Sequence, residues 1–552
     1  MELNKNQKLA SELIDKSCCV LAGPGTGKTL TITAKIVNLL HQNIPSTEVV
    51  ALTFTQKAAA EMRQRIFNVL KNKETLPFIG TFHLLCIKLL RDFLSEKNFQ
   101  ICTRQKQIEI LKSLGDRNPD KTAEKISRFK STSAPLEDDS YRIYLKYEEA
   151  KRKLNLFDFD DLLLETLRLQ TEGVIPPLFS YIIVDEFQDT NRIQYEIIKK
   201  LLKKDGQLCV FGDPDQAIYS FRGSEVELFL NLPKDFKDLV LINLGLNYRC
   251  QANIVFASNA FITLNTKRFS KKIEPIKDKT HPIYVIEASD EYEEAKIVLR
   301  EIKKRVGVID FTELYQNKEE SNYSFSSFAI LARTNSQLEL FKEFLTEAGI
   351  PFKTLPKEEE GRIRSLVDSL SRVVYEDSIK SHLFKEISLL ALLRNYGFFE
   401  SLNDKEAYIV ENIVKTYEKG VLIERIKGVI DELITLTSYD LFPEDLNAVS
   451  LLTLHGTKGL EFPVVFITGC EEGLIPYSLA KDVDIEEERR LFYVGMTRAM
   501  DELILTYSKS RLLHGKRLSL PSSSFITQIP KEYLYFKKSS QQKCKPKQRQ
   551  LF

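Results

Sequence analysis

The chain has 552 residues, which is too long for one hydrophobic core, so several domains are expected. Its 79 basic and 77 acidic residues leave a net charge of +2, which neither indicates nor excludes a nucleic-acid partner, because a basic groove can be offset by acids elsewhere. With 43% hydrophobic and 28% charged residues it has the composition of a soluble globular protein, and no apolar run is long enough to span a membrane.

The eight cysteines are scattered and form no C-x-x-C pair, so nothing in the sequence supports a zinc or iron–sulfur site. They fit reduced, mostly buried thiols. The polar start, Met1–Asn6, has no apolar signal segment. We therefore expect a cytoplasmic protein.

The first predicted strand, Cys18–Leu21, leads into a glycine-rich turn and then into helix-like sequence through Leu40. The turn reads Ala22-Gly23-Pro24-Gly25-Thr26-Gly27-Lys28-Thr29. Its glycines let successive backbone N–H groups surround a phosphate, Lys28 can reach the β- and γ-phosphates, and the Thr29 hydroxyl can bind Mg²⁺. Ala22 stands where the usual pattern has Gly. A glycine-rich turn without function is the alternative, which the strand before it and the helix after it disfavour.

The next strand candidate, Val49–Thr55, is followed from about Arg91 to Phe157 by charged, helix-rich sequence that is predicted to be an insertion. The strand pattern then resumes in an apolar run that ends at Val184, directly before Asp185 and Glu186. One carboxylate can hold a metal ion and the other can orient or deprotonate a water. A helix N-cap followed by a first-turn acid is the alternative, although the phosphate loop upstream favours the hydrolytic pair.

Two more strands, Leu208–Phe211 and Leu239–Leu244, complete the first α/β domain. Gln216 follows the first of them and is placed near the phosphates, where it can report on a γ-phosphate, unless it is only a polar loop residue. Next come Tyr219, Phe221 and Arg222. Aromatic and guanidinium planes are what single-stranded bases stack on, but ordinary core packing explains this segment equally well.

A second α/β region carries no phosphate loop, so it is not a second independent ATPase. It is interrupted from about Lys353 to Ala448 by helical sequence, contains a polar loop at Asn317–Ser327, and ends in a Lys/Gln/Ser-rich tail, Lys531–Phe552, that is predicted to be disordered. Its strands are predicted at Ile283–Ile286, Phe328–Leu331, Val449–Leu454, Val464–Ile467 and Leu503–Thr506.

Two arginines of this region, Arg249 and Arg498, follow motif-like sequence. An arginine aimed at a γ-phosphate stabilises transition-state charge and contributes about 10³–10⁵ in rate. If such arginines come from a second domain, hydrolysis is coupled to domain closure. A surface salt bridge is the alternative for each.

The order and the residues of these segments resemble those of the UvrD/Rep/PcrA family of superfamily one DNA helicases, over about Leu3 to Lys516. Further matching segments are Leu3–Gln7, Ala51–Met62, Gly80–His83, Asp185–Asn191, Leu454–Phe462 and Tyr493–Ala499. The resemblance implies two RecA-like P-loop-type parallel-sheet domains with a helical insertion in each, which is an α/β fold. It assigns 1–90 and 157–240 to the first domain, 91–156 to its insertion, 241–352 and 449–530 to the second domain, 353–448 to a reduced helical accessory domain, and 531–552 to the tail.

The resemblance also implies roles for single residues. Gln7 reads adenine, Tyr248 stacks on it and Glu461 contacts the ribose. Lys28 and Thr29 hold phosphate and Mg²⁺, Asp185 supports the metal, Glu186 activates the water, and Gln216, Arg249 and Arg498 sense and stabilise the γ-phosphate. The residues expected to contact single-stranded DNA are Phe54, Thr81, His83, Tyr219, Phe221, Arg222, Asn335 and His455. The two histidines have a structural role as their alternative.

Three departures from the family pattern bear on function. Phe221 stands where the family usually has Trp, and Leu30 where it often has an Arg that sandwiches adenine, so step size and nucleotide discrimination can differ. The accessory domain is expected to have about half the family's size, and no C-terminal nuclease block is expected.

The implied function is an ATP-dependent 3′→5′ DNA helicase and single-strand translocase acting in DNA repair, replication or recombination. Its substrates would be single-stranded DNA and 3′-tailed duplexes, and no membrane partner is expected. The alternatives are a non-unwinding translocase that strips proteins from single strands, and a clamp-tethered binding module with ATP as a switch. The last residues, Gln548 to Phe552 with Leu551, resemble peptides that dock on DNA sliding clamps, or are a tail without function.

Overall fold

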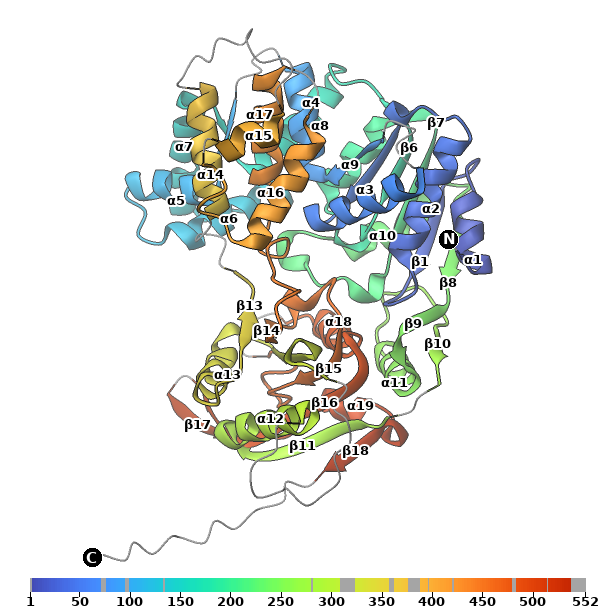
Figure 1. The fold of residues 1–552 in the computed structure, drawn as a ribbon, viewed down its shortest axis with the longest axis vertical. Helices are drawn as coiled ribbons and strands as arrows, with labels where there is room; N and C mark the ends of the chain where they lie inside the picture. The colour runs from blue at the N-terminus through green and yellow to red at the C-terminus, as the bar shows by residue number, and fades with distance from the viewer. Residues whose placement is uncertain are drawn as a thin grey trace, which may run out of the picture. The chain divides into compact units, whose positions relative to one another are not determined.

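The computed structural model describes residues 2–70, 76–94, 99–132, 135–278, 281–307, 323–356, 362–375, 388–395, 397–418, 421–478, 483–513 and 515–537. The chain divides into two compact units (Figure 1). Unit 1 consists of Met1–Gly245, Lys267–Lys272 and Leu355–Pro443. Unit 2 consists of Leu246–Thr266, Ile273–Thr354 and Glu444–Phe552.

Unit 1 is built on a parallel sheet of six strands in the order β3-β2-β6-β7-β1-β8. All the strands predicted for this domain are present. One was missed, β3, because a glycine interrupts its short apolar run. The strands are β1 (Cys18–Ala22), β2 (Val49–Thr53), β3 (Phe78–Thr81), β6 (Phe179–Val184), β7 (Leu202–Gly212) and β8 (Val240–Leu244).

Both faces of this sheet are covered, which explains why its central strands are apolar without alternation. Along β1, Cys18 and Val20 join one hydrophobic cluster, and Cys19 and Leu21 join the other. The helices of the α/β body are α1 (Lys5–Glu12), α2 (Lys28–His41), α3 (Gln56–Leu70), α4 (Phe82–Phe93), α8 (Phe159–Thr171), α9 (Arg192–Leu201) and α10 (Val226–Asp235).

The register of the parallel strands brings the functional turns to one edge. Leu21 on β1 pairs with Gly212 on β7, and Val184 on β6 pairs with Val210 on β7. The carboxyl ends of β1, β7 and β6 are therefore level, and the turns that follow them lie side by side. Parallel α/β sheets bind ligands at this edge.

The predicted insertion is helical and has its own small core around Leu111, Ile126 and Tyr147. Two buried lysines, Lys130 and Lys151, lie among acidic side chains and pair with Asp158 at 2.8 and 2.7 Å. The insertion consists of β4 (Gln100–Ile101), α5 (Arg104–Ser113), α6 (Pro119–Thr132), α7 (Asp138–Lys153) and β5 (Leu156–Phe157).

The predicted accessory segment is also helical, and it belongs to unit 1. Its helices share a hydrophobic core, and α17 packs beside α4 (Figure 1). The sequence indicated an interruption of the second domain but not the body on which it packs. The helices are α14 (Arg362–Tyr375), α15 (Leu389–Asn395), α16 (Asp404–Thr416) and α17 (Leu422–Ile434).

Unit 2 contains a second, mostly parallel sheet with the strand order β13-β14-β12-β15-β16-β11-β18, and β17 pairs antiparallel with β16. The five predicted strands are confirmed, while β13, β17 and β18 were missed. The strands are β11 (Ile283–Asp290), β12 (Phe328–Ala332), β13 (Phe352–Thr354), β14 (Val449–Thr453), β15 (Phe462–Ile467), β16 (Ala499–Leu513), β17 (Lys516–Ser519) and β18 (Leu534–Lys537).

Helices flank this sheet, and a separate parallel pair, β9 with β10, lies outside it. These elements are β9 (Leu246–Gln251), β10 (Glu274–Lys277), α11 (Ala252–Ile262), α12 (Glu291–Val306), α13 (Asn335–Glu347), α18 (Ile485–Met496) and α19 (Ser524–Gln528).

The prediction of a disordered tail from Lys531 was wrong for its first seven residues. A 3₁₀ turn, Lys531–Tyr533, is followed by β18, which pairs with β11. Backbone pairing to an existing edge strand holds this Leu-Tyr-Phe-Lys segment in place although lysines surround it. The rest of the tail lies outside the described residues.

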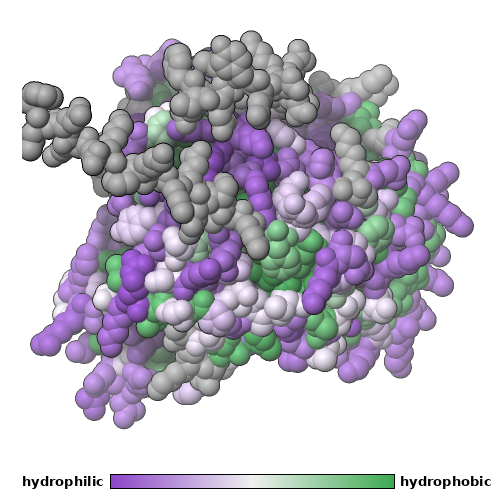
Figure 2. Space-filling view, turned by 90° about the horizontal axis from the view of Figure 1, so that it is seen from below, coloured by the Kyte–Doolittle hydropathy of each residue, from purple (hydrophilic) through white to green (hydrophobic). Residues whose placement is uncertain are grey.

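None of the helices in the described part of the chain is long and apolar enough to cross a membrane. The face drawn in Figure 2 is mostly hydrophilic, with a few hydrophobic patches between polar side chains.

Candidate functional site

The phosphate-binding loop joins β1 to α2 as the sequence predicts. Gly25 and Gly27 have φ of 67° and 79°, in the left-handed region that favours glycine. The Thr26 hydroxyl donates to the carbonyl of Gly23 at 2.8 Å, which closes the loop on itself. Helix α2 begins at Lys28, so its first N–H groups point into the loop, the arrangement that binds phosphate.

Gln7 lies against this loop. Its amide donates to the carbonyl of Thr26 at 3.0 Å and accepts from the N–H of Asn4 at 3.0 Å, and only 3% of Gln7 is exposed. A Cβ on Gly27 would lie 2.5 Å from the Gln7 amide nitrogen. These contacts show that Gln7 braces the phosphate loop. The adenine-reading role that the resemblance implies stays a prediction.

Lys28 forms ion pairs with both carboxylates that follow β6. Its ammonium contacts the Glu186 carboxylate directly and lies 3.6 Å from that of Asp185. Burial lowers the pKa of Lys28, but the two carboxylates outweigh it and raise that pKa above its ordinary value. Burial raises the pKa of Asp185 to about 6, against the opposing effect of Lys28. The four predicted members of the hydrolytic site from these two turns, including Thr29 on the first turn of α2, are thus brought together.

The residues present fit a magnesium ion. Asp185 and Thr29 offer a carboxylate and a hydroxyl, which are hard oxygen donors of the kind Mg²⁺ prefers. The raised pKa of Asp185 reflects a buried carboxylate that a divalent cation would keep ionised.

Glu186 is held in an unusual conformation. Its φ is 50°, and its N–H donates to the Asp185 carboxylate at 2.9 Å. The Gln188 amide donates to the Glu186 carboxylate and accepts from the N–H of Asp213 at 3.0 Å. Gln188 is fully buried. The sequence contained Gln188 within the motif but gave no reason to assign it this role.

The turn after β7 carries the predicted sensor. The Gln216 amide donates to the Asp213 carboxylate at 3.0 Å, and both residues are buried. Two basic residues that the sequence analysis missed, Arg268 and Lys271, pair with Asp215 at 2.7 and 2.9 Å. They lie more than fifty residues along the chain, in loop sequence without a motif, so no sequence signal points to them.

The predicted DNA-contacting aromatics of unit 1 form one stack. The rings of Phe54 and Tyr219 are parallel, with centroids 5.2 Å apart, and Phe221 meets Tyr219 edge-on at 5.9 Å. Phe221 is 58% exposed, whereas Tyr219 is only 2% exposed. Phe221 is therefore the exposed ring of this group, and Tyr219 packs beneath the surface; that Phe221 stacks on a DNA base stays a prediction. The side chain of Arg222 lies outside the described residues.

Thr81 and His83 lie at the start of α4. The Thr81 hydroxyl caps the helix by accepting from the N–H of Leu84 at 3.4 Å. His83 packs edge-on against Phe159, and burial lowers its pKa to about 4, so it is neutral at pH 7. These contacts favour the structural alternative for His83.

In unit 2 the predicted nucleotide residues form one group. Arg249 pairs with Glu461 at 2.6 Å and donates to the carbonyl of Thr497 at 3.4 Å. Arg498 is buried and donates to the carbonyls of Val494 and Leu460 at 3.0 and 3.2 Å. Tyr248, next to Arg249, is 45% exposed.

The two remaining predicted DNA residues follow neighbouring strands of unit 2. Exposed Asn335 begins α13 after β12, and half-buried His455 begins the turn after β14. The N–H of Leu454 donates to the carbonyl of Ala332 at 2.9 Å, so the two strand ends are adjacent.

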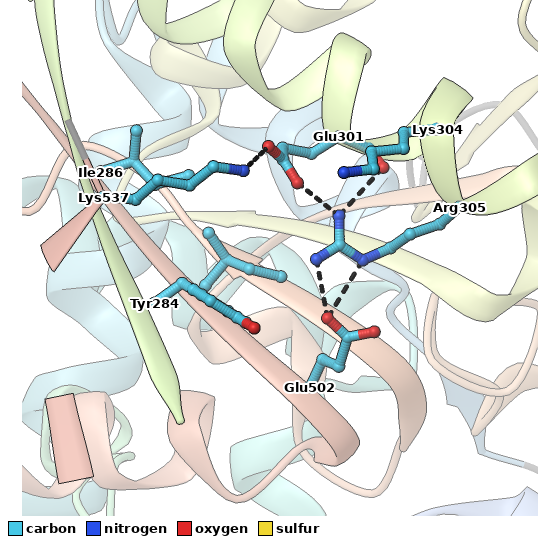
Figure 3. Close-up of a pocket in the computed structure, with 8 residues that line it drawn as sticks. Tyr284, Ile286, Glu301, Lys304, Arg305, Glu502 and Lys537 are labelled. Carbon is cyan, nitrogen blue, oxygen red and sulfur yellow. Dashed lines mark hydrogen bonds and ion pairs between the residues drawn. The ribbon is translucent and has the colours of Figure 1, made fainter. Parts of the chain in front are cut away.

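Unit 2 also has a surface hollow of about 240 Å³ that no sequence feature indicated (Figure 3). Four of its charged lining residues, Glu301, Arg305, Glu502 and Lys537, pair with one another. Arg305 binds Glu502 at 2.7 Å and Glu301 at 2.6 Å. Lys537 also binds Glu301. Because these charges are satisfied internally, the hollow gives no sign of a ligand.

Two family models match the chain. The UvrD/REP helicase N-terminal domain matches residues 3–237, and the UvrD-like helicase C-terminal domain matches residues 242–359 and 400–510. The first match contains the phosphate loop, the carboxylate pair and the sensor turn.

Similar proteins match over nearly the whole chain. DNA helicase II of Escherichia coli (strain K12) is 30% identical, over 96% of this chain and 88% of its own length. A probable DNA helicase II homolog of Mycoplasma capricolum is 30% identical over 97% and 88%, and the ATP-dependent DNA helicase PcrA of Bacillus subtilis is 29% identical over 96% and 86%. The resemblance and the fold class expected from the motifs are confirmed, and the chain belongs to the UvrD/REP helicase family.

Proposed function

We propose that the chain is an ATP-dependent DNA helicase that moves 3′ to 5′ along single-stranded DNA and acts in repair, replication or recombination. One observation carries this proposal: Lys28, Asp185 and Glu186 meet at the carboxyl edge of one parallel sheet. Its relatives are named as ATP-dependent DNA helicases, which supports DNA as the substrate.

Lys28 and the N-terminus of α2 bind the phosphates of ATP in this proposal. The ammonium exchanges its carboxylate partners for β- and γ-phosphate oxygens, and the loop N–H groups surround the same oxygens. Thr29 and Asp185 would hold Mg²⁺, which, when bound, neutralises charge on the phosphate oxygens.

Glu186 is the base. Once Lys28 pairs with phosphate, the Glu186 carboxylate is available to accept a proton from the attacking water. Gln188 keeps that carboxylate oriented. Gln216 contacts the γ-phosphate, and Arg249 and Arg498 stabilise its developing charge. Phe221 provides the surface on which a DNA base stacks.

The test combines one variant with two substrates. Glu186→Gln keeps the size of the side chain but removes the base, so we expect ATP binding to persist and turnover to fall by about 10²–10⁴. Unwinding of 3′-tailed but not 5′-tailed duplexes by the unmodified chain is expected. Normal turnover in the variant overturns the base assignment, and a preference for 5′ tails overturns the polarity.

A second candidate is a translocase that strips proteins from single strands without unwinding duplexes. The short accessory segment favours it, and residues 360–399 of that segment are not matched by the family model. Strand displacement and single-strand translocation, measured side by side, separate the two candidates. Translocation without displacement supports the second.

We also propose that the tail residues Gln548, Leu551 and Phe552 dock on a sliding clamp and that the protein acts in the cytoplasm. These residues lie outside the described part of the chain, so the docking proposal rests on sequence alone. Removing Leu551 and Phe552 is expected to abolish clamp pull-down and leave the ATPase unchanged. Unaltered clamp binding overturns it.

A further inference from the structure

A short basic segment, Lys267–Lys272, which we name the strap, belongs to unit 1 although the chain on both sides of it belongs to unit 2. Residues 246–266, which include α11, precede it, and the strand β10 follows it. The chain therefore passes from unit 2 to unit 1 where the strap begins and returns to unit 2 where the strap ends, six residues later. Such a double crossing needs contacts that hold the strap, and the structure shows them.

The strap binds the turn that follows β7 through buried charges. This turn, Asp213–Gln216, carries the predicted sensor and is called the sensor turn below. Arg268 binds the Asp215 carboxylate with two nitrogens, at 3.0 and 2.7 Å. Lys271 binds Asp213 directly and Asp215 at 2.9 Å. The Lys271 side chain is 3% exposed and that of Asp213 is fully buried. A buried lysine between two buried carboxylates is far less replaceable than a surface pair.

Other contacts fix the strap in place. Phe269 lies against the core of unit 1, with its ring 6.0 Å from that of Phe229. The Asn243 amide donates to the carbonyl of Lys272 at 3.1 Å. Lys267, in contrast, makes an exposed pair with Glu227, in which both side chains are about half exposed.

The carboxylate that Lys271 holds is the one that orients the proposed machinery. Asp213 accepts from the Gln216 amide, and its N–H donates to Gln188, which in turn donates to Glu186.

The residues just before the strap are attached to helix α18. Thr266 donates to the Glu486 carboxylate through its N–H at 2.8 Å and its hydroxyl at 2.7 Å. The Asn265 amide donates to the carbonyl of Glu486 at 2.9 Å. Arg498 follows the end of the same helix and donates to the carbonyl of Val494 on it.

We propose that the strap couples the sensor turn to helix α18, and that Lys271 is a positioning residue for Gln216 and Glu186. A change in the position of Gln216 would move Asp213, the strap and, through Thr266, the helix that leads to Arg498. This inference rests on the proposed function, because it gives the strap a task only if Gln216 and Glu186 act on ATP.

The first test removes the buried charge. In Lys271→Ala we expect kcat of the DNA-stimulated ATPase to fall at least tenfold, while KM for ATP changes by less than about threefold, because the phosphate loop is untouched. Lys271→Arg restores the charge and should recover most of kcat. Lys267→Ala removes the same charge from the same segment at an exposed position and should behave like the unmodified chain. An unchanged kcat in Lys271→Ala, or equal losses in both alanine variants, overturns the proposal.

The second test acts at the other end of the strap and covers the case in which Lys271→Ala fails to fold. Glu486→Ala releases Thr266 without touching the sensor turn. ATP hydrolysed per nucleotide translocated should rise at least threefold while ATP binding is unchanged, and an unaltered ratio overturns the coupling. Glu186→Gln is measured in parallel. If it retains turnover, the proposed function fails, whereas an inactive Glu186→Gln with an unaffected Lys271→Ala refutes the strap alone.

Discussion

The attachment of the accessory helices to unit 1 gives a sharp stability prediction at Arg91. This residue on α4 binds Asp431 on α17 with two nitrogens, both at 2.6 Å. The side chains are 17% and 7% exposed. Burial raises the pKa of Asp431, and Arg91 opposes that rise. Arg91 also lies over the ring of Phe99, 4.8 Å from its centroid.

Replacing Arg91 with Ala leaves the Asp431 carboxylate buried without its cation. Breaking a buried ion pair from one side costs about 3–5 kcal/mol, and the lost cation–π contact adds about 0.5–2 kcal/mol. The neighbouring acid, Glu432, stays bound to Arg63 at 2.6 Å. We therefore expect the accessory helices to open locally, with the sheet of unit 1 left intact.

Hydrogen exchange measures this opening directly. A cost of about 3 kcal/mol raises exchange roughly a hundredfold or more in α14–α17, because each 1.4 kcal/mol is a factor of ten. Amides of β1 and β6 should not change. The control is Arg168→Ala on α8, which removes the largely exposed pairs of Arg168 with Glu165 and Glu172 and should cost about 1 kcal/mol or less.

The double variant Arg91→Ala/Asp431→Ala separates charge burial from lost packing. Removing the stranded carboxylate should restore at least half of the lost protection, because the desolvated charge is the main cost. Uniform acceleration across unit 1, or less than threefold acceleration in α17, contradicts the reasoning that this pair attaches the accessory helices.

Three further predictions concern the site. The pKa of Asp185, raised to about 6 from 3.8, means that the folded chain binds this proton more tightly than the unfolded chain, so the stability it contributes is present at low pH and is lost as pH rises through about 6. Urea unfolding without nucleotide should show a fall of about 3 kcal/mol at most between about pH 4 and 7 from this group, and Asp185→Asn should lack this part of the pH dependence. Gly27→Ala should weaken ATP binding more than tenfold, because the added Cβ would lie 2.5 Å from the Gln7 amide nitrogen. The control is Gly115→Ala, where φ is 83° and no atom lies near the added Cβ, so that variant bears backbone strain alone. Equal nucleotide affinity in the two variants argues against Gln7 as a brace on the loop. Phe221→Ala should weaken single-stranded DNA binding by about 1–3 kcal/mol in a fluorescence titration, while Phe67→Ala, which removes an exposed ring on α3, should not; unchanged affinity for Phe221→Ala makes that ring a packing residue.

Much of the fold could be predicted because its signals are local. Cys18–Ala22 and Ile182–Val184 are apolar runs followed by the residues proposed to act on ATP, so the same segments predict both the strands and the candidate site. β18 was missed because its stability comes from pairing with β11, which is 250 residues away in sequence. Tyr219 and Phe221 look alike in sequence, yet Tyr219 is buried, with Phe54 stacked on its ring, and Phe221 is exposed.

The contacts that the sequence did not predict are ion pairs between residues far apart in the chain. Asp213 and Asp215 follow a strand as Asp185 and Glu186 do, and the pattern alone gives both pairs the same standing. The structure separates them by their cations. Lys271 and Arg268, from a segment far along the chain, neutralise Asp213 and Asp215. Asp185 and Glu186 instead pair with Lys28, which is also the proposed ligand of phosphate.

That shared lysine has a consequence for the proposed reaction. While Lys28 is paired with Glu186, the carboxylate is a poor base, because a bound ammonium stabilises its ionised form. Phosphate oxygens carry more charge and draw Lys28 away, so the arrival of ATP both fills the loop and frees Glu186. Hydrolytic competence then depends on the substrate itself. In the proposed mechanism, water is activated only after a nucleotide phosphate has drawn Lys28 away from Glu186.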